Sequence, residues 1–511
     1  MERVPHESTN PGGVVRGIFD PFGVDTHIRV PSHGFHPWLM ILFPFGEHAS
    51  TGLSRQRGPE VNMTLDEIKK LFATHHIDKV KLGGFDVDGV LRGKYISLEK
   101  FWSGTAAGLG FCDVIFGWDS SDALYDNVRM TGWHTGYPDG VARIDLSTFR
   151  VLPWEPDTAC FLVDFFNKDG SPLAVSPRQV LRRIVQRAQS MGYVPNAAIE
   201  YEYFFFAEDP QSIRQKHFRD LAPLSPGMFG YSFLRASVHS DLAHTILNNL
   251  RAMGIEIEGF HTETGPGVYE TAIRYSDALS AADHAALFKT VVKILAQKHA
   301  LVATFMAKWN SNLPGCSGHI HQSLADAKGS RNLFYAPRAE DGMSDLMRHF
   351  MAGQLALMRE FAVMFLPTIN SYKRTVPGTW APTNVTWGVD NRTAALRAIP
   401  AGSKATRVEH RLPGADSNPY LALAASLASG LYGIEKKLTL PAPAVNAYES
   451  KAPPLPGTLE KAGALFLASD VAREYFGADF VEHYGATRQW EVREFRRAVT
   501  DWELARYFEI I

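Results

Sequence analysis

The chain has 511 residues, a length for which about three domains are expected, and its 45% hydrophobic and 21% charged residues are typical of a globular protein with a large core. A formal net charge of -2 lacks the basic excess of a general nucleic-acid binder, so no nucleic-acid partner is expected. Three scattered cysteines, Cys112, Cys160 and Cys316, form neither a disulfide framework nor a CxxC zinc motif, and they fit a reducing cytoplasm.

The first 60 residues are rich in glycine, proline, histidine and serine, a composition that predicts an extension with little regular structure. The segment lacks the basic start and apolar centre of a secretory signal. Its most apolar run, residues 38–45, is too short to cross a bilayer and contains a proline, so we expect no membrane association. We interpret this run as a buried strand or an arm on a neighbouring subunit, with a partner-binding segment as the alternative.

Residues 61–168 predict a small α+β domain. Thr64 is followed three residues later by Glu67, the capping-box pattern, and this predicts a helix from there to about residue 75. An Asp-Gly turn within residues 80–90 predicts a hairpin, and residues 159–165 are a candidate closing strand. The turn-forming residues 169–172 mark the boundary with the next domain.

A larger domain is predicted over residues 169–511, which makes the chain an α+β protein overall. Its first helix carries Pro177 in the first turn. Further helices are predicted over 276–299 and 343–364. Residues 418–431 form a helix of small residues that we interpret as a tightly packed core helix.

Two carboxylates share one face of a predicted strand within residues 197–206. Glu200 and Glu202 are two residues apart, so their side chains point the same way. Ionised carboxylates side by side among apolar residues repel each other and lose hydration, so they need a cation or a shared proton. A hard divalent cation such as Mg²⁺ binds carboxylate oxygens. The alternative interpretation of this motif is a solvated sheet face.

Further candidate ligands follow downstream. Glu263 and Glu270 flank a Gly-Pro-Gly turn. His319 and His321 lie two apart on a predicted strand after a glycine-containing loop, and the alternative for His321 is a core histidine. Acidic and imidazole groups in three separate segments favour a metal site over a solvated face.

Six separated motifs resemble those of the glutamine synthetase family, type I branch, in the family's order over about residues 65–511. The motifs are Glu200 to Phe206, Glu263 to Glu270, Ser317 to Leu324, Asn370 to Gly378, Asp390 to Thr393, and Arg407 to Arg411 followed by Asn418 to Leu421. The resemblance implies an amino-terminal β-grasp domain and a larger α/β catalytic domain. It also implies a ring homo-oligomer of ten or twelve chains with active sites between adjacent subunits.

The same resemblance implies at least two cations, Mg²⁺ or Mn²⁺, with ATP as co-substrate. One cation would be held by Glu202, Glu263 and Glu270, and the other by Glu200, His319 and Glu409. The implied ATP contacts are His321, Ser323, Lys404 and Arg407, the implied phosphate-facing catalytic residues are Arg392 and Arg397, and the implied contacts to the amino-acid substrate are Gly315, Arg374 and Arg411.

The reaction implied is ATP-dependent amide formation. The γ-carboxylate of glutamate attacks the terminal phosphate of ATP, and an amine then displaces phosphate from the acyl phosphate. Because carboxylate and triphosphate are both anionic, the reaction needs cations and positioned arginines at the developing charge.

The sequence departs from ordinary glutamine synthetases where the amine binds. Trp380 stands where the family carries a flap glutamate that helps bind ammonium, and an indole cannot accept a proton. Asp119 is predicted to keep the role of the aspartate in the ammonium pocket. Pro314 and Val268 also replace family residues near the substrate. These changes resemble the ligases that join glutamate to organic amines.

Two alternatives remain. One is glutamine synthesis from ammonia with an altered flap. The other is a non-catalytic assembly protein like lengsin, which has lost metal ligands, whereas this chain keeps the whole set.

Overall fold

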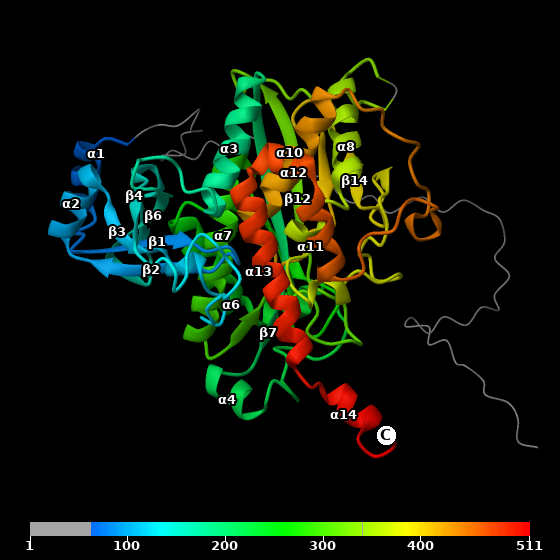
Figure 1. The fold of residues 1–511 in the computed structure, drawn as a ribbon, viewed down its shortest axis with the longest axis horizontal. Helices are drawn as coiled ribbons and strands as arrows, with labels where there is room; N and C mark the ends of the chain where they lie inside the picture. Colours follow the sequence, from blue (N-terminus) through cyan, green and yellow to red (C-terminus); the bar gives the residue numbers. More distant parts are fainter. Residues whose placement is uncertain (1–62, 340) are drawn as a thin grey trace, which may run out of the picture. The chain divides into compact units, whose positions relative to one another are not determined.

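The computed structural model describes residues 63–339 and 341–511 (Figure 1). The predictions for residues 1–60, including the apolar run at 38–45, therefore lie outside the described residues. Two sheets with their helices make up the described chain, and both belong to one compact unit.

The smaller sheet has the strand order β2-β1-β6-β4-β3, with β5 paired to β6. Its strands are β1 (Lys79–Phe85), β2 (Leu91–Ile96), β3 (Leu109–Cys112), β4 (Asp139–Ile144), β5 (Arg150–Leu152) and β6 (Glu155–Phe166). The predicted hairpin is β1–β2, where Gly89 has a φ of 79° that suits glycine. The predicted strand at 159–165 lies within β6. Both predictions are confirmed.

Two helices accompany this sheet, α1 (Leu65–Thr74) and α2 (Leu98–Ala107). The predicted capping box is present at the start of α1: the Glu67 amide donates to Thr64 Oγ1 at 3.2 Å, and the Thr64 amide donates to Glu67 Oε2 at 2.7 Å. These bonds satisfy backbone donors that a helix start leaves without partners.

The larger sheet has the order β13-β14-β15-β12-β7-β9-β8, with β10 and β11 paired to β7. Its strands are β7 (Tyr193–Phe206), β8 (Ile257–Thr262), β9 (Val268–Ile273), β10 (Ser276–Asp277), β11 (Val302–Thr304), β12 (Gly318–Asp326), β13 (Trp387–Val389), β14 (Leu396–Ile399) and β15 (Arg407–His410). The long strands β7 and β12 pair antiparallel over nine residues and form its centre.

The helices of this part are α3 (Pro177–Ser190), α4 (Pro210–Gln215), α5 (Phe233–Val238), α6 (Ser240–Ala252), α7 (Ala278–Lys298), α8 (Asp345–Leu357), α9 (Ala362–Phe365), α10 (Pro419–Glu435), α11 (Leu459–Ala468), α12 (Asp470–Phe476), α13 (Ala478–Arg497) and α14 (Asp501–Tyr507). Helices cover one face of the large sheet, and on this face Tyr201 and Tyr203 of β7 pack on Phe288 of α7. Glu200 and Glu202, which alternate with these tyrosines along β7, therefore point to the other face.

The predicted core helix of small residues is confirmed as α10, which packs on α3 and α8 beside β12 (Figure 1). Its contact with α8 is close because glycines face backbone there. A Cβ added at Gly353 would lie 2.1 Å from the Ser429 carbonyl oxygen, and one at Gly433 would lie 2.1 Å from the His349 carbonyl oxygen.

The single helix predicted over 343–364 is wrong in one respect, since it is divided into α8 and α9. Residues 361–366, which include α9, are all buried. Phe361 packs instead on Phe466 and Phe476 of the carboxy-terminal helices. These contacts lie at the break between the two helices.

The two sheets are joined by hydrogen bonds between distant segments. The Asn418 side-chain amide donates to the Asp86 carbonyl at 3.1 Å, and Arg488 pairs with Asp88 at 2.7 Å. The predicted domain boundary at 168/169 falls between the sheets, and independent folding of the small domain stays a prediction. Within residues 63–339 and 341–511, no helix is long and apolar enough to span a bilayer.

Candidate active site

Strand register brings the predicted ligands to one face of the large sheet. Glu200 lies opposite His319 in the β7–β12 pair, and Glu202 lies opposite Glu270 in the β7–β9 pair. Directly opposed residues in antiparallel strands project from the same face. By the same rule His321 of β12 lies opposite Glu409 of β15, on the same face as His319. Four strands thus supply five of the six predicted ligands.

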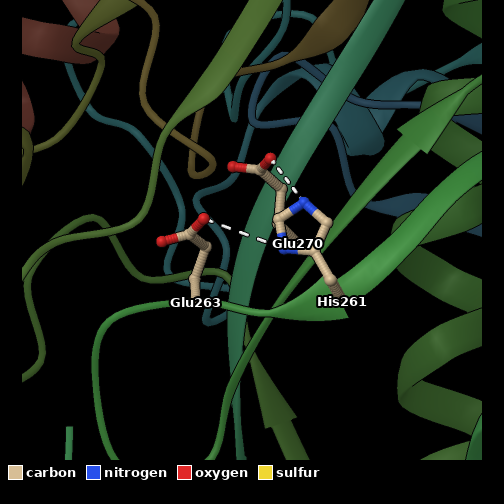
Figure 2. A group of neighbouring side chains, drawn as sticks. All are labelled: His261, Glu263 and Glu270. Atoms are coloured by element: carbon tan, nitrogen blue, oxygen red, sulfur yellow. Dashed lines mark ion pairs between the residues drawn. The ribbon is translucent and has the colours of Figure 1, made fainter. Parts of the chain in front are cut away.

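The sixth ligand, Glu263, follows the end of β8 and is joined there by a residue that the sequence analysis did not name. Figure 2 shows His261 between Glu263 and Glu270, with ligand atoms of all three within 4.8 Å of one another. His261 Nε2 lies 3.2 Å from Glu270 Oε1, and Nδ1 lies 3.7 Å from Glu263 Oε1. The signal in the sequence was its position two residues before Glu263 on a strand.

The carboxylates in this arrangement lie close enough to change one another's pKa. Burial, together with the hydrogen bond and negative charge of Glu200, raises the pKa of Glu270 well above its usual range. Burial works against ionised Glu200 too, but hydrogen bonds from Glu270 and His321 outweigh it and hold its pKa well below normal. Glu270 therefore carries the proton that the pair shares.

Glu409 is held ionised by a different group of neighbours. Burial opposes its charge, but Arg411 and the two histidines of β12 outweigh burial and lower its pKa to about 2. Arg411 contacts Glu409 Oε1, and Arg397 Nη1 lies 3.0 Å from Oε2. Burial, followed by the charge of Arg411, lowers the pKa of His319 to about 3. His319 is thus a neutral imidazole, the form that can bind a metal.

The predicted ATP contacts divide between the sheet and a loop. His321 Nε2 lies 3.0 Å from Glu200 Oε2, while its Nδ1 accepts from Arg407 Nε at 3.2 Å. Ser323 projects from the same face of β12, two residues further on. Lys404 is exposed in the loop before β15.

The predicted substrate residues form a buried basic corner. Arg374 is 4% exposed and Arg411 is 6% exposed, and the Nε–H of each has no hydrogen-bond partner among the described residues. Gly315 is required beside them, because a Cβ there would lie 2.4 Å from the Ala307 carbonyl oxygen and 2.6 Å from Arg374 Cγ. Two buried guanidinium groups with unsatisfied donors can hold the carboxylates of a small acid.

Trp380 lies on the loop between Arg374 and β13. Its side chain is 63% exposed, and its φ of 59° places the backbone in the left-handed region. The next residue, Ala381, is anchored by a hydrogen bond, because the Tyr448 hydroxyl donates to its carbonyl at 3.2 Å. The indole therefore stands out from an anchored loop with most of its surface open to solvent.

Arg392 and Asp119 are the two remaining predicted catalytic residues. Arg392 is exposed in the turn between β13 and β14. Asp119 belongs to the small domain, where its Oδ1 accepts from the amides of Ser121 and Ala123 at 2.8 Å each. Among the described residues, no hydrogen bond or ion pair joins Asp119 to the ligand group of its own chain.

The donor set fits divalent cations. Five carboxylates and the neutral imidazole of His319 converge on one face, and Glu200 and Glu270 share a proton where no cation is bound. Glu202 shows the same crowding, since burial raises its pKa although its Oε2 accepts from the Ser317 amide at 2.6 Å.

Comparison with known proteins agrees with this geometry. The family model for "Glutamine synthetase, catalytic domain" matches residues 174–507. The chain belongs to the glutamine synthetase family. It is therefore an ATP-dependent carbon–nitrogen ligase that acts on glutamate, as its relatives in this family indicate.

Curated relatives of the family cover most of the chain. Type-1 glutamine synthetase 2 of Dictyostelium discoideum is 50% identical over 84% of each chain. Glutamate–isopropylamine ligase of a Pseudomonas species is 43% identical over 87% of this chain and 98% of its own. Gamma-glutamylethanolamide synthetase GlnA4 of Streptomyces coelicolor is 41% identical over 87% and 96%.

A solved structure of this fold, apo GmaS without ligand, superposes with a TM-score of 0.76. It is 27% identical and covers 87% of this chain and 99% of its own. The α+β glutamine synthetase fold predicted from the sequence is thereby confirmed.

Proposed function

We propose that this family member joins the γ-carboxylate of glutamate to an organic primary amine through a γ-glutamyl phosphate. The observation that carries the proposal is Trp380, an exposed indole on an anchored loop where ammonia-using members carry a glutamate. Two of the relatives are named for organic amines, isopropylamine and ethanolamine.

In this proposal Arg374 and Arg411 bind the carboxylates of glutamate through the donors that lack partners. Mg²⁺ or Mn²⁺ held by the six predicted ligands, with His261 beside them, would neutralise the charge of carboxylate and triphosphate. Arg397 is paired with Asp390 and Glu409, so it would have to release these partners before it could contact phosphate. Exposed Arg392 contacts phosphate without such an exchange.

ATP binding is assigned to His321, Ser323, Lys404 and Arg407. The neighbouring side chains give a reason for two of them: the Arg407 guanidinium reaches the His321 ring, and both flank the predicted metal site. The Arg407 guanidinium would give a triphosphate bound there one permanent positive charge, in addition to the charges of the metals.

We further propose a ring of ten or twelve chains, in which Asp119 of one subunit completes the amine pocket of its neighbour. The proposal is supported by the bonding of Asp119, whose Oδ1 accepts from amides of its own turn and which has no hydrogen bond or ion pair to the ligand group among the described residues. The free thiols of Cys112, Cys160 and Cys316 fit the reducing cytoplasm in which we place the reaction.

The test is phosphate release from ATP with glutamate and a panel of amines: ammonia, ethylamine, isopropylamine, ethanolamine and benzylamine. We expect kcat/KM to be higher for an organic amine than for ammonia. A preference for ammonia would establish glutamine synthesis, the function for which the 50% identical relative is named. Absence of turnover with every amine, in protein that binds ATP, would establish the non-catalytic alternative.

A further inference from the structure

A second charged site lies on the other side of the large sheet. A cavity of about 660 Å³ opens between the carboxy-terminal half of α7, the β1–β2 turn and residues 304–306. Figure 1 shows β1 and β2 beside α7. None of the predicted metal, ATP or substrate residues lines this cavity, and its volume is in the usual range for small-molecule sites.

The cavity wall carries an excess of positive charge. Lys289, Lys293 and Lys298 of α7 line it, together with Asp88 and Asp416. Asp88 is already paired with Arg488 at 2.7 Å, so it does not neutralise the lysines. Asp416 Oδ2 accepts from the Ser371 hydroxyl at 2.6 Å and from the Thr368 hydroxyl at 2.9 Å. No ion pair joins any of the three lysines to a carboxylate among the described residues.

Lys289 is the most constrained of the three. Its side chain is 9% exposed, and its ammonium donates to the Ser417 carbonyl at 3.0 Å. Burial, followed by the charge of Lys293, lowers its pKa to about 7. The charge of Asp416 opposes this shift, but no ion pair joins Asp416 to Lys289 among the described side chains, and a buried ammonium without a paired carboxylate is costly.

We propose that this cavity binds a small multivalent anion, of the phosphate or dicarboxylate type, between Lys289, Lys293 and Lys298. One anion of charge -2 would supply the counter-charge that the lysines lack, and its oxygens would accept from the ammonium groups. The site is independent of the amine that the ligase uses, so the two proposals are tested separately.

The cavity lies directly behind the predicted metal-binding strand. Lys289 Nζ is 5.6 Å from the Tyr201 ring centroid, and Tyr201 lies between Glu200 and Glu202 on β7. The Tyr201 ring also stacks on Phe288, the residue before Lys289. An anion bound here would contact the small domain through the β1–β2 turn and the catalytic sheet through Lys289.

The experiment is isothermal titration of the full-length protein, without ATP, using inorganic phosphate and succinate as probes and acetate as the monovalent control. Because Arg374 and Arg411 can also hold a small acid, we expect one saturable site per chain in Arg374→Gln protein for one of the two divalent probes, and that probe identifies the anion type. Lys293→Gln, a change at an exposed side chain, should weaken this binding about tenfold or more, because it removes a charge-assisted partner. Lys289→Met should do the same, and circular dichroism reports whether each variant folds.

Two control variants distinguish binding in this cavity from binding at the substrate arginines or at surface lysines in general. Arg374→Gln removes a predicted substrate arginine and should leave the binding unchanged. Lys69→Gln on α1 removes an exposed surface lysine and should also leave it unchanged. Binding that is lost in Arg374→Gln and retained in Lys293→Gln would overturn the proposal, since the anion would then occupy only the substrate site. No saturable binding, or equal weakening by Lys69→Gln, would overturn it as well.

Discussion

At the scale of single residues, the candidate site is defined by charges that the protein alone cannot balance. Glu200 and Glu270 share a proton, while Glu409 obtains its counter-charge from Arg397 and Arg411. Glu263 and Glu270, which lie beside His261, differ from Glu409 because no lysine or arginine among the described residues forms an ion pair with them. A divalent cation bound beside His261 would supply their counter-charge.

Glu270→Gln tests this interpretation. In the metal-free protein Glu270 is protonated at neutral pH, because burial and Glu200 raise its pKa, so the amide should change the free energy of unfolding by less than about 0.5 kcal/mol. In Mg²⁺ the variant should lose much of the stabilisation that wild type gains, about 1.4 kcal/mol for each tenfold loss of affinity. Thermal unfolding with and without Mg²⁺ measures both quantities. An equal Mg²⁺ effect in both proteins would remove Glu270 from the ligand set.

Trp380→Glu tests the amine preference. A carboxylate at this position gives ammonium a charge-assisted partner, worth about 1.5 to 3 kcal/mol, or roughly tenfold to a hundredfold in binding. The ratio of kcat/KM for ammonia to that for the best organic amine should rise by this amount. Trp380→Phe is the matched control, since it keeps an apolar ring and should keep the ratio. If Trp380→Glu leaves the ratio unchanged, Trp380 does not determine specificity.

At the scale of elements, the catalytic face depends on strands that are fixed from behind by helices. Gln322 of β12 accepts from Gln354 of α8 at 2.9 Å and from Ser426 of α10 at 2.6 Å. These bonds fix the position of β12. His319 and His321 lie on the face of β12 opposite to Gln322. The spacing of α8 from α10, set by Gly353 and Gly433, therefore bears on the position of two site residues.

Gly353→Ala should destabilise the protein by about 1 to 3 kcal/mol, because its Cβ would lie 2.1 Å from the Ser429 carbonyl oxygen and the two helices would have to separate. Gly463→Ala in α11 is the matched control. Its Cβ would meet Arg488 Cβ at 3.9 Å, an ordinary contact, and alanine in a helix should stabilise by about 0.4 to 1 kcal/mol. Urea unfolding compares the two variants, and similar effects in both would contradict this account of the α8–α10 contact.

At the scale of the whole molecule, Asp119 makes no hydrogen bond or ion pair to the ligand group of its own chain among the described residues. Arg374 and the ligand group belong to the large sheet and its loops, whereas Asp119 belongs to the small domain, where its Oδ1 is bonded within its own turn. If Asp119 acts on a neighbour's substrate, the two halves of each active site come from different subunits.

Subunit complementation measures this directly. Asp119→Ala and Arg374→Ala should each lower activity at least about tenfold, and co-expression of the two should restore about a quarter of wild-type activity, the share of sites that combine two intact halves in a randomly mixed ring. The control is co-expression of Glu202→Ala with Arg374→Ala, which alter the same half and should restore none. Failure of the first pair to complement, in mixed oligomers verified by light scattering, would place both residues in the same chain's site or exclude Asp119.

The sequence by itself determined the features that depend on residues close together in the chain. The capping box of α1, the Asp-Gly turn after β1, the shared face of Glu200 and Glu202 and the order of the family motifs are all local patterns, and local geometry follows from them. Residues two apart on a strand share a face wherever the strand lies.

Tertiary structure alone decided what depends on pairing between distant segments. His261 joined the site because β8 pairs with β9 in a register that sets it opposite Glu270, and no local pattern encodes that register. The chain divides into α8 and α9 where Phe361 packs on helices that lie about a hundred positions further along the chain. The lysine-lined cavity likewise exists only where α7 meets the β1–β2 turn. Such contacts are set by packing across the whole chain, which sequence spacing does not record.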